Sequence, residues 1–149
     1  MIIRRADSRE PADCALWAEM LARLHGGTAA EFAMEVPGWF TLDEPMLCWL
    51  AFTGNGQPIG MIDARKRNYA EDAPNLVAAY VEDLWVEPAH RGQGVARALL
   101  GAVEAWARNA GLDWLGSDTA PDNAASRAFH RAAGFTEIEE LVVFGKPLV

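Results

Sequence analysis

Residues 80–100, which read YVEDLWVEPAHRGQGVARALL, decide the fold of this chain. The first part has the tyrosine, valine, leucine and tryptophan content of a β-strand, and Pro88 ends that strand. From Val95 onward the apolar residues recur at helical spacing, which predicts an α-helix to about Ala110. The sequence therefore predicts a strand, a short turn and a long helix in immediate succession.

The turn at residues 91–96 contains two glycines directly before the predicted helix. Glycines have no side chains, so backbone N–H groups can converge where the helix N-terminus is electropositive, as a pyrophosphate requires. The alternative is a tight turn without a ligand. Two nucleotide motifs do not fit. The dinucleotide fingerprint needs a third glycine where Arg97 stands, and the Gly-Lys-Ser/Thr of a P-loop is absent.

Two blocks of the sequence resemble the GNAT acetyltransferase superfamily. Arg91, Gly94 and Ala96 follow its acetyl-CoA loop, and a second block from Asn123 to Phe135 reads NAASRAFHRAAGF. The resemblance implies an α/β (α+β) fold with helices on both faces of a mixed, mostly antiparallel sheet. It also implies that this sheet splays between strands 4 and 5 around the cosubstrate acetyl-CoA. The implied cofactor-binding residues are Leu84, Trp85, Val86, Arg91, Gly92, Gln93, Gly94, Val95, Ala96, Arg97 and Asn123.

The rest of the chain supplies the other elements of that fold. Strands are predicted at residues 1–6, 46–53, 58–65, 77–86, 113–118, 135–139 and 141–144. Helices are predicted from Pro11 to about Leu24, from the cap Thr28 to Glu35, over residues 95–110, and from about Pro121 to Gly134. We expect residues 1–149 to form one acetyltransferase domain, because this length suffices for a single core.

The amino-acid composition limits the classes of molecule that this chain could bind. The chain carries 13 basic and 21 acidic residues, a net charge of −8, which argues against nucleic acid and favours a cationic small molecule or simply solubility. No apolar run approaches the roughly 18 residues of a membrane span, and the N-terminus does not read as a signal peptide. Cys14 and Cys48 have no metal-binding spacing. We expect reduced thiols, no metal and a cytoplasmic location.

Glu82 and His130 are the candidate catalytic residues. Glu82 lies in an apolar strand, where an acid costs free energy unless it is paired or functional. Alternation puts Glu82 and Asp83 on opposite faces unless a bulge intervenes. By resemblance, His130 stands where many superfamily members carry a tyrosine near the CoA sulfur, and imidazolium is a competent acid. The alternative for Glu82 and Asp83 is an acid on a solvated face of the sheet. His130 could instead be a surface histidine on a short helix, and Asn123 a capping residue in the first turn.

A closer resemblance, over about residues 68–144, is to the small-dimer branch of the aminoglycoside 6'-N-acetyltransferases. The pairs Asn68-Tyr69 and Val81-Glu82 and the run Ser117-Asp118-Thr119 carry it. It implies that Tyr69, Glu82 and Asp118 line the acceptor site and that the enzyme is a homodimer. The chain departs from this branch at Leu24-His25-Gly26, where the branch often has Leu-Trp-Pro, and at Asp83, where it commonly has glycine. Both positions border the implied acceptor site.

Two other functions stay open at this point. The acceptor could be another amine, such as a polyamine or a peptide N-terminus. The chain could also be a module that binds acyl-CoA without turnover, although the presence of both Glu82 and His130 argues against that.

Overall fold

The computed structural model describes residues 1–149, which divide into two compact units, Met1–Ser117 and Asp118–Val149. The strands are β1 (Ile2–Arg5), β2 (Leu47–Phe52), β3 (Pro58–Arg67), β4 (Ala78–Val86) and β5 (Leu115–Gly116). The helices are α1 (Pro11–His25), α2 (Ala29–Trp39), the 3-10 turn η1 (Pro88–His90), α3 (Val95–Asn109) and α4 (Ala124–Ala132). None of the helices combines the length and the apolar character that a bilayer-spanning segment needs.

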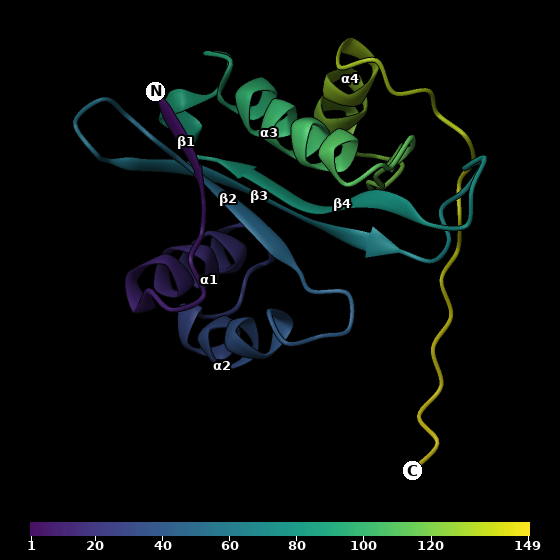
Figure 1. Ribbon diagram of the computed structural model, residues 1–149, viewed down its shortest axis with the longest axis horizontal. Coiled ribbons are helices and arrows are strands. Elements are labelled where there is room, and N and C mark those ends of the chain that lie inside the picture. The colour runs from purple at the N-terminus through teal and green to yellow at the C-terminus, as the bar shows by residue number, and fades with distance from the viewer. The chain divides into compact units, whose positions relative to one another are not determined.

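The first unit is built on one five-stranded sheet in the order β1-β2-β3-β4-β5. Neighbouring strands are antiparallel, except that β4 and β5 are parallel. Helices α1 and α2 lie on one face of this sheet and α3 lies on the other (Figure 1). Because each face is covered, both can carry apolar side chains. The predicted mixed, mostly antiparallel sheet with helices on both faces is confirmed.

The core lies on both faces of the sheet. Trp17 and Leu21 of α1 are fully buried against β2 and β3. On the opposite face, the absence of a side chain at Gly60 lets α3 pack closely. A Cβ built at Gly60 would lie 2.8 Å from the Trp85 carbonyl oxygen and 3.3 Å from Cδ1 of Leu99. This close approach brings the start of α3 onto the end of β4.

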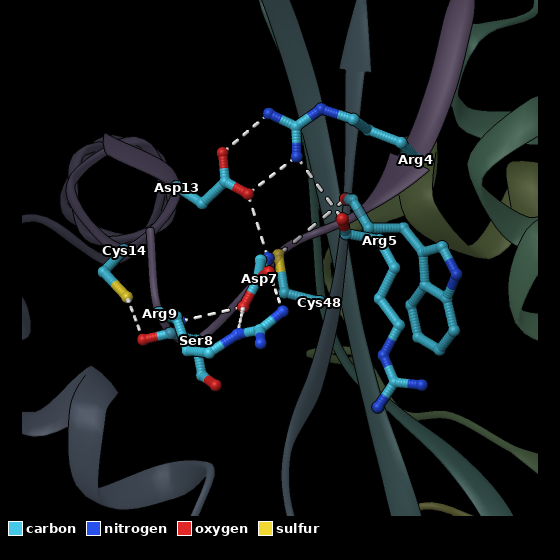
Figure 2. Close-up of polar contacts among 9 residues, drawn as sticks. Arg4, Arg5, Asp7, Ser8, Arg9, Asp13, Cys14 and Cys48 are labelled. Carbon is cyan, nitrogen blue, oxygen red and sulfur yellow. Dashed lines mark hydrogen bonds and ion pairs between the residues drawn. The ribbon is translucent and has the colours of Figure 1, made fainter. Parts of the chain in front are cut away.

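Asp13, in the first turn of α1, ties that helix to the N-terminal strand (Figure 2). The two terminal nitrogens of Arg4 donate to its two carboxylate oxygens at 2.6 and 2.7 Å, and the Asp7 backbone N–H donates at 2.9 Å. The hydrogen bonds from Arg4 lower the pKa of the nearly buried Asp13 carboxyl. A buried carboxylate with these three donors is stabilised as the anion.

Helix α2 begins as predicted but ends later. Thr28 caps it in a capping box, since its hydroxyl accepts from the Glu31 N–H and the Glu31 carboxylate accepts from the Thr28 N–H. The predicted end at Glu35 is wrong, because the helix continues through Pro37 to Trp39. The Trp39 ring packs edge-on against Trp17 with centroids 5.4 Å apart. We attribute the extra turn to this aromatic packing, which outweighs the local cost of the proline.

Three predicted strands differ from the structure. The fifth is shortened to Leu115–Gly116, and residues 135–149 form neither of the two strands predicted at 135–139 and 141–144. A strand needs a hydrogen-bonded neighbour, which apolar composition alone does not supply. Val143 and Phe144 are each 89% exposed.

Candidate functional site

The glycine turn between β4 and α3 has the geometry of an anion cradle. After η1, Gly92 and Gly94 adopt left-handed φ angles of 72° and 84°, and Gly94 is the N-cap residue of α3. The Arg91 Nε donates to the Val86 carbonyl at 2.9 Å, which holds the turn against the end of β4. The Gln93 side chain donates to the Ala89 carbonyl at 3.0 Å.

No side chain caps the start of α3, and a Cβ at Gly92 or Gly94 would meet no atom within 4 Å. The first N–H groups of a helix have no partners within the helix, so an uncapped start in open space can bind a phosphate. Here those groups belong to Val95 and Ala96, two of the residues expected to bind the cofactor. The glycines are required for their φ angles.

β4 has an open edge beside this cradle. It pairs with β5 only at Ala79 and Tyr80, opposite Leu115 and Gly116, although β4 itself continues to Val86. The sheet therefore splays between β4 and β5, as predicted. The backbone of residues 84–86 lies past the last pair, where an extended chain with amide groups could add to the strand.

A β-bulge at Glu82 interrupts β4. Asp83 pairs with Asp63 and Val81 pairs with Ala64, so Glu82 has no partner residue on β3. A bulge breaks the alternation of side chains along a strand. The sequence puts Glu82 and Asp83 on opposite faces of the sheet unless a bulge intervenes. That bulge is present, so the two side chains can share one face.

The contacts of the two acids show that they share one face of the sheet. Asp83 bonds to His25 of α1, and its partner Asp63 bonds to Trp17 of the same helix. Glu82 bonds to Arg65 and Arg67, which share the Asp63 face because they lie at alternate positions of β3. Both acids therefore lie on the α1 face.

Glu82 is held by two arginines. Its Oε1 accepts from the Nε of Arg65 at 2.9 Å and from the Nε of Arg67 at 2.7 Å, and its Oε2 accepts from Nη2 of Arg67 at 2.6 Å. Burial alone would raise the pKa of Glu82, but the hydrogen bonds from Arg67 and Arg65 outweigh it and lower that pKa. Glu82 is therefore an anion with most of its acceptor capacity occupied.

Asp63 is a fully buried acid that the sequence analysis did not single out. Its Oδ2 accepts from the Trp17 indole N–H at 2.7 Å, whereas its Oδ1 is buried without a hydrogen-bond partner. Burial and the nearby Asp83 carboxylate raise the pKa of Asp63 well above its usual value. In the sequence, an aspartate within the apolar run of residues 59–64 indicates a buried acid at this position.

The remaining predicted site residues fall in three places. Tyr69 is 62% exposed, in the loop after β3. Asp118 is exposed at the start of the second unit, and Asn123 and His130 belong to α4 in that unit. The roles of these four residues stay predictions.

Within α4, Asn123 is the N-cap residue, and its side-chain oxygen accepts from the Ser126 N–H at 3.1 Å. His130 Nδ1 lies 2.8 Å from the Ser126 carbonyl oxygen, which can only accept, so Nδ1 carries a hydrogen. To give a proton to a thiolate through Nε2, His130 would have to be the imidazolium.

The family model described as the acetyltransferase (GNAT) family matches residues 15–135, most of the chain and both units. The chain belongs to the acetyltransferase (GNAT) family. The cradle, the open edge of β4 and α4 all lie within the matched residues. This acetyltransferase uses acetyl-CoA as its acyl donor, as the sequence predicts.

Individual relatives are similar over nearly their whole length. An aminoglycoside N(6')-acetyltransferase type 1 of Stenotrophomonas maltophilia is 36% identical over 139 residues, covering 93% of this chain and 90% of the relative. The crystal structure of an aminoglycoside antibiotic 6'-N-acetyltransferase from Acinetobacter haemolyticus matches with a TM-score of 0.87 and 31% identity, covering 100% of both chains. AAC(6')-Iy in complex with the bisubstrate analogue CoA-S-monomethyl-acetylneamine matches with a TM-score of 0.83 and 27% identity, covering 98% of this chain and 97% of the other.

Proposed function

We propose that this acetyltransferase transfers the acetyl group of acetyl-CoA to a primary amine of a polycationic small molecule, the 6'-amine of an aminoglycoside. The observation that carries the proposal is the similarity to aminoglycoside 6'-N-acetyltransferases along almost the whole chain. The net charge of −8 suits a cationic acceptor.

The reaction forms a C–N bond and breaks the C–S bond of the thioester. The acceptor ammonium loses a proton, its nitrogen attacks the carbonyl carbon, and the CoA thiolate leaves and takes up a proton. In the proposed mechanism Glu82 positions or deprotonates the amine, directly or through water, and His130 returns a proton to the thiolate. Tyr69 and Asp118 line the acceptor site, and Asn123 contacts CoA.

We further propose that the two units form one domain, that the enzyme works in the cytoplasm, and that it is a homodimer. The family match that continues across the boundary after Ser117 supports a single domain. The free thiols of Cys14 and Cys48 suit a reducing compartment. A run of exposed apolar side chains at residues 141–144 supports an interface with a second copy. Sedimentation equilibrium at micromolar concentration should give the dimer mass, and a monomer mass would refute the dimer.

An acceptor panel tests the function. Release of the CoA thiol is followed with a kanamycin-type aminoglycoside, a polyamine and a peptide N-terminus, and the acetylated position is determined by NMR. We expect the highest kcat/KM for the aminoglycoside, with the acetyl group on the 6'-amine. A preference for the polyamine or the peptide would replace the proposed acceptor. Acetyl-CoA binding without turnover of any amine would identify a non-catalytic module.

A further inference from the structure

Arg65 and Arg67 both bind the carboxylate of Glu82, which is the proposed binding group for the acceptor ammonium. The Glu82 side chain is only 15% exposed, and three guanidinium N–H groups bind its two oxygens at 2.6–2.9 Å. Two positive charges therefore surround one negative charge. At this point of β4 the protein itself supplies the cations that an ammonium-bearing acceptor would bring.

Arg67 is the more firmly held of the two. It binds Glu82 through two nitrogens, and its guanidinium carbon lies 3.6 Å from the centroid of the buried Tyr80 ring. A stacked, bidentate arginine is oriented before any ligand arrives, so it competes effectively for the carboxylate. Arg65 contributes a single N–H to the same oxygen that Arg67 also binds.

This arrangement opposes an incoming cation in two ways. An acceptor ammonium must take a carboxylate lone pair that a guanidinium already uses, and it must approach two like charges. Hydrogen bonds to charged groups are the stronger ones in proteins, so exchanging one is a substantial part of an acceptor's binding energy. An acceptor with several ammonium groups brings other favourable contacts to offset this cost.

We propose that Arg65 and Arg67 control acceptor affinity: they occupy Glu82 until an acceptor ammonium replaces one guanidinium group, and this competition weakens the binding of every amine acceptor. This inference rests on the proposed function, because it takes Glu82 to be part of the acceptor site. It assigns the two arginines of β3 to the control of acceptor affinity.

Steady-state kinetics of three variants test the proposal. Arg67→Gln removes two hydrogen bonds and one positive charge from Glu82, so the KM of both a kanamycin-type acceptor and a polyamine should fall roughly tenfold or more. Arg65→Gln removes one hydrogen bond and should lower KM less. Arg67→Lys keeps the charge without the planar fork and should lie between Arg67→Gln and the parent protein.

The matched control is Arg108→Gln on α3, which breaks an exposed ion pair with Glu104 and should leave KM unchanged. Unchanged acetyl-CoA affinity shows that each variant is folded. If Arg67→Gln does not fold, Arg65→Gln carries the test alone. An unchanged or raised KM in the folded arginine variants would overturn the proposal, because the arginines would then be structural or would bind the acceptor themselves.

A second measurement separates this inference from the proposed function. In ¹⁵N-labelled parent protein, the Nε–H resonances of Arg65 and Arg67 should shift when the best acceptor of the panel is added to saturation, because Glu82 releases at least one guanidinium group. If the parent acetylates the aminoglycoside and neither resonance moves, the inference fails while the proposed function stands. If the aminoglycoside is not acetylated but another amine is, and that amine shifts the resonances, the proposed acceptor fails and the role of the arginines stands.

Discussion

Nε2 of His25, at the end of α1, lies 2.6 Å from Oδ1 of Asp83 on β4. The two residues are 58 positions apart, and each lies in a stretch where the chain departs from the pattern of the branch it resembles. Asp83, at the second of these departures, is thus the hydrogen-bond partner of His25, at the first. The contact joins the end of α1 to the strand residue beside Glu82.

A double-mutant cycle should show that these two residues are coupled. We expect His25→Ala and Asp83→Ala to be non-additive in the free energy of unfolding, with an interaction energy of about 1 kcal/mol, because each removes the same hydrogen bond. Urea unfolding of the parent, both single variants and the double variant gives this energy. Additivity within about 0.3 kcal/mol would mean that the contact contributes nothing in solution.

Gly94→Ala should weaken acetyl-CoA binding. An added Cβ meets no neighbour within 4 Å, but the φ of 84° is strained for alanine by about 1–2 kcal/mol, and the cradle should relax away from its phosphate-binding form. Gly56→Ala in the β2–β3 hairpin is the matched control, since its φ is 86° and its surroundings are equally open. Both variants should lose similar thermal stability, whereas calorimetric titration should show weaker acetyl-CoA binding only for Gly94→Ala. Equal affinity in both would remove the cradle from the cofactor site.

Asp118→Asn should discriminate between acceptors. The substitution keeps the shape and the hydrogen-bonding capacity but removes the charge. If Asp118 lines the acceptor site, KM for an aminoglycoside should rise about tenfold, equivalent to ~1.4 kcal/mol, with acetyl-CoA affinity unchanged. Glu82→Gln should lower kcat and also raise KM, because Glu82 is proposed both to bind the acceptor ammonium and to position or deprotonate the amine. Steady-state kinetics with aminoglycoside and simple monoamine acceptors, at low and high salt, measure both effects. If Asp118→Asn has the same KM as the parent for both acceptor types, Asp118 does not belong to the acceptor site.

Asp63 should make the protein less stable as the pH rises. Its pKa is raised in the folded protein, so above the unfolded pKa of about 3.9 the unfolded state has lost a proton that the native state still holds. The free energy of unfolding therefore falls with pH from about 4 up to the folded pKa. Asp63→Asn keeps an oxygen for the Trp17 indole and removes this titration. Its stability advantage over the parent should grow as the pH rises through that range.

Urea unfolding at a series of pH values measures this slope, and Asp13→Asn is the control of opposite sign. The pKa of Asp13 is lowered in the folded protein, so its contribution is present above about pH 3.9 and is lost as the pH falls through the folded pKa. Asp13→Asn should therefore lose stability chiefly at neutral pH. A difference between Asp63→Asn and the parent that does not vary with pH would show that Asp63 does not bind an extra proton in the native state.

Local sequence was sufficient for the elements that depend on local chemistry. Thr28 was predicted as a helix cap because its hydroxyl reaches the N–H three residues on. The turn before α3 was predicted from its two glycines, and Gly94 adopts a positive φ that glycine takes without strain. Strands β1 to β4 carry enough β-branched and aromatic residues, with clear turns between them, to be located within a few residues.

Tertiary structure alone decided which charges meet. The bulge at Glu82 puts this acid on the same face as Asp83, because the register with β3 overrides the alternation that the strand would otherwise follow. The partners of Glu82 are Arg65 and Arg67, 17 and 15 residues away, and no local pattern indicates such a pairing. Tertiary packing also decided where helix α2 ends. The helix continues past Pro37, and its last residue, Trp39, packs on Trp17. A residue's own sequence neighbours set its backbone preferences. The pKa of a carboxyl such as Glu82 or Asp63 depends instead on burial and on charges brought close by the fold, which only the assembled sheet and its helices supply.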